Sequence, residues 1–244
     1  MIAKRAEIEV RKDVILGLTV ENYIKTVMPV SSQLIVDESS LDVSSATVRN
    51  IFAELEKEGY LTHPHTSAGR IPTEKGYRYY VDNLMNEIKL LEDEKQRIRA
   101  EYKRQTLVLE ELLDKTSRVL SNTTHYTSII SIDGKSRIFC KGTSYIAQYP
   151  DYQDLNKIRN ILATLEEQEQ LMELINRDLQ KRIDILIGHE IACKDMQSCS
   201  LVVSQYKTKR GLTGRIAVLG PTRMEYDRVV STLDYFSQLM EEIL

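Results

Sequence analysis

A long segment without glycine or proline limits the fold of this chain more than any other feature. The chain has 244 residues, and no glycine or proline lies between Gly76 and Gly134. Because these two residue types are the strongest local signals for turns, we expect this segment to be mostly helical. It separates two regions with different patterns, residues 1–83 and 121–244. At roughly 100–200 residues per domain, the length allows two modest domains.

Composition and charge argue against several classes of protein. Apolar residues make up 42% of the chain and charged residues 28%, which argues against disorder and fibrous repeats. The formal net charge is −3, so any binding of nucleic acid has to depend on a local patch. Charges at the N-terminus predict no signal peptide, and the lack of a run of about 20 apolar residues predicts no membrane span. The cysteine pattern fits a protein of the reducing cytoplasm.

The cysteines and the motif content argue against several kinds of site. Cys140, Cys193 and Cys199 are an odd number without Cys-x-x-Cys spacing, so we expect neither a disulfide framework nor a zinc site. No nucleophile elbow, zinc-protease helix or dinucleotide fingerprint is present. We therefore expect no enzymatic activity and no cofactor.

Residues 1–83 show the order helix, helix, connection, helix and short hairpin. Helix boundaries are marked by a proline, by N-capping hydroxyls and by a C-terminal glycine. In chain order these residues are Pro29, Ser31, Ser32, Ser44, Gly59 and Thr73. Residues 60–61 and 70–71 are predicted to pair as short strands. This order is typical of a winged helix-turn-helix.

The third predicted helix has one apolar face and one polar face. Spacing of i, i+3, i+4 and i+7 predicts a buried stripe of Val48, Ile51, Phe52 and Leu55. The opposite side carries Ala46, Arg49, Asn50 and Ala53, a combination that suits a major groove. Arginine pairs with guanine edges, asparagine pairs with adenine edges, and alanines allow close approach. Hydroxyls at a helix N-terminus suit phosphate. The candidate DNA-binding residues on this helix are Ser44, Ser45, Ala46, Thr47, Arg49 and Asn50. The alternative is a solvated helix face that carries one arginine.

The loop within residues 63–73 is the second candidate for DNA binding. Gly69 permits a tight turn, and a polar finger around it can lie along phosphates or enter a minor groove. The candidate residues are His65, Thr66, Ser67 and Arg70, with His63 beside them. The two histidines also suggest a metal site, but no cysteine or carboxylate ligand set accompanies them, so we expect no metal. A polar hairpin tip without a ligand is the alternative.

Residues 84–120 are predicted to form a long connecting helix. Steps of four and three residues from Leu84 to Val119 place seven aliphatic residues and one tyrosine in eleven seam positions. Lys95 and Gln105 interrupt the seam. Two interpretations are open: a coiled coil between two subunits, or one amphipathic helix docked on its own chain.

Residues 121–244 are predicted to form an α/β module. Apolar or alternating runs indicate five strands, and two longer stretches have helical spacing. The predicted strands are 127–132, 136–140, 183–187, 200–206 and 215–219, and the predicted helices are 155–182 and 224–244. Gly220 and Pro221 precede Arg223 at a strand-to-helix turn. We expect Arg223 to pair internally, with Glu190, Glu225 or Asp227, rather than to bind an anion.

Several runs resemble the HrcA family, the bacterial heat-inducible transcription repressors. The run PHTSAGRIPTEKGYRYYVD (64–82) resembles the signature of this family, and PVSSQLIV and LDVSSATVRNIFAELEKEGYLTHP resemble its helix-turn-helix. Near the C-terminus, IGHEIACKDMQSCSLVVSQY (187–206) and GRIAVLGPTRMEYDRVV (214–230) resemble the same family in the same order. The resemblance covers nearly the whole chain.

The resemblance implies an α+β protein of three parts. These are a winged-helix DNA-binding domain (1–83), the connecting helix (84–120) and a reduced GAF-like domain (121–244). It implies a homodimer that represses chaperonin genes by binding double-stranded DNA at an inverted repeat, depends on the GroE chaperonin, and is released on heat stress. Residues 44–50 match the start of the recognition helix, and residues 65–70 match the wing. The alternative is a winged-helix regulator of another regulon whose C-terminal domain senses a small effector.

One departure from the family pattern concerns dimerisation. Typical members are about a hundred residues longer, and much of this length is a domain inserted in the GAF-like module that helps dimerisation. Here TSIISI is followed almost directly by KSRIFCKGTSYIAQYPDYQDL, which resembles the sequence after that insert. The insert and part of the usual sheet are therefore expected to be missing. The helix over 84–119 or the helices within 155–182 are expected to hold the dimer instead.

Overall fold

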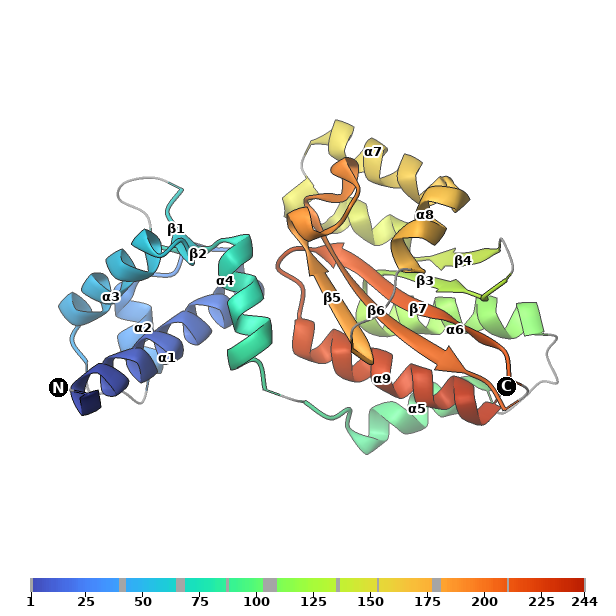
Figure 1. Ribbon diagram of the computed structural model, residues 1–244, viewed down its shortest axis with the longest axis horizontal. Coiled ribbons are helices and arrows are strands. Elements are labelled where there is room, and N and C mark those ends of the chain that lie inside the picture. The colour runs from blue at the N-terminus through green and yellow to red at the C-terminus, as the bar shows by residue number, and fades with distance from the viewer. Residues whose placement is uncertain are drawn as a thin grey trace. The chain divides into compact units, whose positions relative to one another are not determined.

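The chain forms two compact units in the computed structural model. The structure describes residues 2–39, 43–64, 69–86, 88–102, 109–134, 137–152, 154–176, 181–209 and 211–243. The first unit comprises Met1–Asn86 and the second comprises Glu87–Leu244 (Figure 1). No helix within the described residues is long and apolar enough to cross a membrane.

The first unit has the predicted order of helices and hairpin. Its elements are α1 (Ile2–Thr26), α2 (Ser32–Glu38), α3 (Ser45–Lys57), β1 (Leu61–Thr62), β2 (Ile71–Pro72), α4 (Glu74–Tyr79) and a π-helical turn, η1 (Tyr80–Leu84). The strands β1 and β2 are antiparallel. The hydroxyls of Ser31, Ser44 and Thr73 cap α2, α3 and α4, as predicted. Gly59 follows α3 with φ of 81°, the left-handed conformation that ends many helices at a glycine.

The core of the first unit is built on the predicted stripe of α3. Val48, Ile51, Phe52 and Leu55 are all buried, with at most 7% of their surface exposed. Apolar residues from the neighbouring elements complete this core: Ile15, Leu16 and Val20 of α1, Ile35 of α2, and Leu61 of β1. The period of 3.6 residues thus orients α3, with one face inward and the opposite face outward.

The second unit is a five-stranded antiparallel sheet with helices on both faces (Figure 1). The strands are β3 (Thr127–Ser131), β4 (Ile138–Lys141), β5 (Ile183–Ile187), β6 (Cys199–Lys207) and β7 (Thr213–Pro221), in the order β4-β3-β7-β6-β5. The helices α6 (Leu109–Thr124) and α9 (Tyr226–Ile243) pack on one face. The other face is covered by α7 (Leu155–Glu166), α8 (Gln168–Ile175) and the 3-10 turns η2 (Thr143–Gln148), η3 (Pro150–Tyr152), η4 (Gly188–Glu190) and η5 (Lys194–Met196).

Alternate residues of the central strands serve the two faces. On β6, Leu201 and Val203 join the apolar cluster beneath α7 and α8. The flanking residues Ser200 and Ser204 point to the other face, where their hydroxyls bond to those of Tyr226 and Ser237 of α9, respectively. Because successive side chains of a strand point to opposite faces, one strand supplies both an apolar core and buried hydroxyl pairs.

The prediction of one continuous helix over residues 84–119 is wrong. Residues 85, 86 and 88–91 are not helical, α5 covers Glu92–Tyr102, and α6 begins at Leu109. The Tyr102 hydroxyl donates to Thr116 Oγ1 at 3.1 Å. In a continuous helix these residues, 14 apart, would be separated by about 21 Å. The two helices therefore fold back on each other.

The apolar seam predicted for this segment is only partly buried, and the buried part packs within the chain itself. Ile98 is 4% exposed, whereas Leu91 is 69% exposed and Ile88 is 49% exposed. Arg99 of α5 bonds to Tyr235 and Glu242 of α9, so α5 is held against the second unit's own C-terminal helix. Of the two interpretations of this segment, the structure favours docking on its own chain.

Two further details differ from the sequence predictions. The helix predicted over 155–182 is interrupted at Glu167, which separates α7 from α8, and residues 177–180 lie outside the described residues. Arg223 pairs internally, as predicted, but with Asp151, at 2.8 Å from Nε to Oδ2. Asp151 precedes Arg223 by 72 residues, and no local pattern indicates this pairing.

Candidate DNA-binding surface

The N-terminal end of α3 is capped and open to solvent. The Ser44 hydroxyl accepts a hydrogen bond from the Thr47 amide at 3.1 Å and lies 3.0 Å from the Thr47 hydroxyl. Ser44 is exposed, and Ser45 and Thr47 are half-buried. Free amides and the positive end of the helix dipole make such an end suitable for a phosphate.

The outward face of α3 carries the predicted residues. Ala46, Arg49, Asn50 and Ala53 are all exposed. They lie on one side of the helix at spacings of three and four residues, opposite the buried stripe. The two short side chains leave room for close approach, and the two polar ones carry donors and an acceptor for base edges. The structure thus brings these four residues together as predicted.

Serine hydroxyls hold the Arg49 side chain. Its Nη2 donates to Ser45 Oγ at 3.1 Å, and its Nε lies 3.3 Å from Ser32 Oγ. The two serine hydroxyls are 2.9 Å apart. These contacts direct Arg49 toward the start of α2, and both partners are neutral hydroxyls. Ser32 was identified from the sequence only as a possible cap, because its contact with Arg49 depends on how α2 packs on α3.

The base of the hairpin is fixed to the segment before α2. Arg70 and Val30 exchange both backbone hydrogen bonds, each at 2.9 Å. A Cβ on Gly69 would lie 2.4 Å from the Val30 carbonyl oxygen, so the close approach of the two backbones requires glycine here. His65, Thr66 and Ser67 of the predicted wing lie outside the described residues.

Side chains at the base of the hairpin contact the last turn of α3. Arg70 Nη2 lies 3.0 Å from Glu56 Oε2, and His63 Nδ1 contacts Glu56 Oε1. Glu56 was not identified from the sequence. The available signal was its place near the C-terminal end of α3, where the helix dipole disfavours a carboxylate unless a cation lies nearby.

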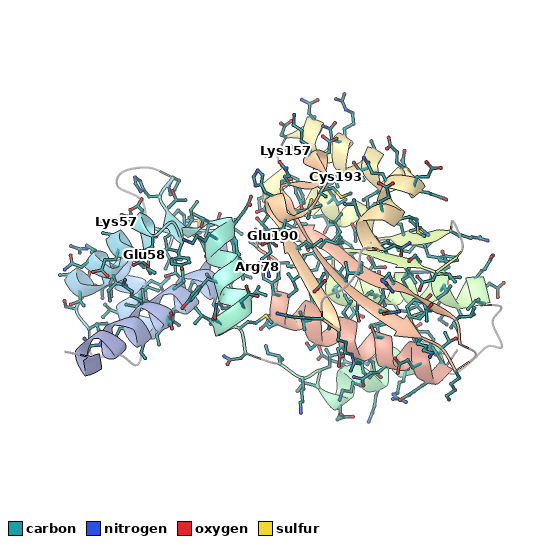
Figure 2. The ribbon with its side chains drawn as sticks, in the orientation of Figure 1. Lys57, Glu58, Arg78, Lys157, Glu190 and Cys193 are labelled. Atoms are coloured by element: carbon teal, nitrogen blue, oxygen red, sulfur yellow. The ribbon has the colours of Figure 1, made fainter. Side chains whose placement is uncertain are left out.

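A second ion-pair cluster joins the same end of α3 to α1. Lys12 Nζ lies 2.9 Å from Glu54 and 2.7 Å from Glu58. Hydrogen bonds and charges from these two carboxylates raise the pKa of Lys12 above its ordinary value. Figure 2 shows Lys57 and Glu58 at this end of the helix. The described residues contain no group of three or more His, Cys, Asp or Glu side chains that could hold a metal ion.

Comparisons with known proteins show a similarity to the HrcA family. The family described as "HrcA protein C terminal domain" matches residues 129–230. The heat-inducible transcription repressor HrcA of Symbiobacterium thermophilum is 28% identical, over 97% of this chain and 98% of that protein. The HrcA protein of Carboxydothermus hydrogenoformans is 27% identical over the same shares. The chain is thus similar to HrcA proteins over nearly its whole length, and its C-terminal part matches the HrcA family. A crystal structure described as a hypothetical protein has the same fold, with a TM-score of 0.74, 21% identity, and coverage of 95% of this chain and 97% of that one.

This chain is shorter than these relatives. The alignments with both relatives run over 336 positions, whereas 97% of 244 residues is about 237. About 100 positions of each alignment, 336 minus 237, therefore have no residue in this chain. This difference agrees with the missing insert that the resemblance implied.

Proposed function

We propose that this protein is a transcription repressor that binds double-stranded DNA through the exposed face of α3. The observation that carries the proposal is the set of Ala46, Arg49, Asn50 and Ala53 on one open helix face, next to a capped helix N-terminus. Both HrcA relatives are named heat-inducible transcription repressors, which supports the same role here.

The first unit acts in this proposal as a winged helix-turn-helix. The helix α3 enters the major groove, α2 lies across its start, and the β1–β2 hairpin forms the base of the wing. The candidates Ser44, Ser45 and Thr47 hold a phosphate at the helix start, while Arg49 and Asn50 contact base edges. His65, Thr66, Ser67 and Arg70 form the wing in the sequence prediction.

The second unit serves in this proposal as a reduced GAF-like domain. Its five-stranded antiparallel sheet with helices on both faces supports this assignment. Two winged helices in symmetric relation match an inverted repeat, so the acting species is a homodimer. The proposed operator lies beside chaperonin genes, the GroE chaperonin keeps the repressor active, heat stress releases it, and the protein acts in the cytoplasm.

The experiment is a fluorescence-anisotropy titration of the full chain. One duplex carries the promoter region of the chaperonin genes from the same genome, and a second duplex has the same composition in scrambled order. Specific binding is expected to be at least about 10³-fold tighter than binding to the scrambled duplex. Adding chaperonin is expected to increase the fraction of active repressor. Equal affinity for both duplexes contradicts the proposal, and preference for another promoter favours a regulator of a different regulon.

A further inference from the structure

We propose that Glu56 is a positioning residue for DNA binding, which holds the base of the β1–β2 hairpin against α3 through Arg70 and His63. This inference rests on the proposed function. It assigns Arg70 to the protein's own helix, whereas the sequence analysis assigned it to DNA phosphates.

The place of Glu56 on α3 calls for neighbouring cations. Glu56 follows Ala53 by three residues, which puts the two on adjoining parts of the helix surface. A carboxylate beside a DNA-binding face repels phosphates, and near the C-terminal end of a helix it also opposes the helix dipole. Charge compensation at Glu56 therefore serves both the helix and its approach to DNA.

The contacts supply this compensation from the hairpin. Each carboxylate oxygen of Glu56 has its own partner: Arg70 for Oε2 and His63 for Oε1. The side chains of Glu56 and Arg70 are 27% and 21% exposed, so water screens the pair only in part. His63 follows β1 and Arg70 precedes β2. The single carboxylate of Glu56 therefore contacts the hairpin on both sides of its loop.

Backbone contacts fix Arg70 in this position in addition to its ion pair with Glu56. Its backbone is bonded to Val30 in both directions, and Gly69 packs against the same carbonyl. Its Nε atom is buried and has no hydrogen-bond partner among the described residues. A phosphate contact by this guanidinium would need the side chain to leave Glu56 and turn outward. The position of Arg70 therefore fits a contact that joins α3 to the base of the β1–β2 hairpin better than a phosphate contact.

The same turn of α3 provides a matched control. Glu54 is two residues from Glu56 and contacts Lys12 of α1 instead of the hairpin. Glu54→Gln removes the same charge from the same helix turn, while Glu58 continues to hold Lys12. General electrostatic effects on DNA binding are therefore measured with this variant and subtracted.

The test is a double-mutant cycle in the full chain. Anisotropy titrations over a range of salt concentrations compare the wild type, Glu56→Gln, Arg70→Gln, the double variant and Glu54→Gln on operator and scrambled duplexes. Circular dichroism confirms that each variant is folded. We expect Glu56→Gln to lose operator affinity relative to Glu54→Gln, Arg70→Gln to lose operator affinity relative to the wild type, and the double variant to be no weaker than either. We expect the salt slope of Arg70→Gln to equal that of the wild type.

Several results overturn the inference. If the losses of Glu56→Gln and Arg70→Gln add up in the double variant, the two residues are not coupled. If all three of these variants bind as tightly as Glu54→Gln, the pair has no role in DNA binding. A salt slope lower by about one unit in Arg70→Gln alone makes Arg70 a phosphate contact. As a second test, the charge-reversed variant Glu56→Arg/Arg70→Glu is expected to bind more tightly than the double glutamine variant. If it folds and binds no better, the inference fails. A wild type without operator preference would instead refute the proposed function itself.

Discussion

Replacing Arg49 with alanine is the most direct test of the proposal that the exposed face of α3 (Ala46, Arg49, Asn50 and Ala53) contacts DNA bases. In the free protein two hydrogen bonds to the half-buried residues Ser45 and Ser32, of 3.1 and 3.3 Å, hold the guanidinium. Because water can replace these neutral partners, release of the side chain costs little. A bidentate contact with guanine contributes about 1–3 kcal/mol of discrimination. We therefore expect Arg49→Ala to weaken operator binding about 5- to 150-fold and to relax preference at one base pair.

Anisotropy titrations with a set of single-base operator variants measure this effect. Lys57→Ala is the control, because it removes an exposed cation from the C-terminal end of the same helix, eight residues and about 12 Å along the axis from Arg49. Its loss estimates the general effect of one positive charge. An equal loss for Arg49→Ala on operator and scrambled duplexes would make Arg49 a phosphate contact. A loss no larger than that of Lys57→Ala would refute the assignment of base reading.

Three stability predictions can be checked by thermal unfolding monitored with circular dichroism. Ser44→Ala removes the cap of α3 and should cost about 1 kcal/mol, while Gln33→Ala, on the exposed side of α2, should change little. Gly69→Ala should destabilise the first unit by about 1–3 kcal/mol, because the new Cβ meets the Val30 carbonyl; a neutral result would contradict the close approach. Ile98→Ala should cost about 2–4 kcal/mol and Leu91→Ala less than about 0.5 kcal/mol, whereas equal effects would contradict the docking of α5.

Local signals in the sequence predicted much of the fold. Ser31, Ser44 and Thr73 cap the helices that they were expected to cap, and the strand predicted at 183–187 has the observed bounds. These features depend on residues close together in the chain, since a cap and its amide, or the residues of one stripe, lie within a few positions. The exposed face of α3 was predictable for the same reason.

Contacts between distant segments were not predictable in this way. The partners of Arg49, Glu56 and Arg223 are 17, 14 and 72 residues away in the chain, at Ser32, Arg70 and Asp151. Such pairs depend on how helices and loops pack, and neither hydrophobic period nor capping chemistry encodes them. The candidate surface could be predicted as a set of residues, and base contact by Arg49 was already expected from the sequence, but the proposed positioning role of the Glu56–Arg70 pair required the fold.

The segment around α5 explains why an apolar seam is weak evidence for a dimer. Spacing of three and four residues describes any helix with one buried side, whether the neighbour is a second chain or the same one. Here the chain leaves the helical conformation at Met85 without glycine or proline, and α5 and α6 fold back on each other through Tyr102 and Thr116. A seam divided between two helices that reverse direction cannot pair along its length with a second copy. Leu113 and Leu120, which lie outside the predicted seam, are fully buried, so the phase of burial on α6 is set by the chain's own sheet. The proposed homodimer therefore needs a contact other than this seam.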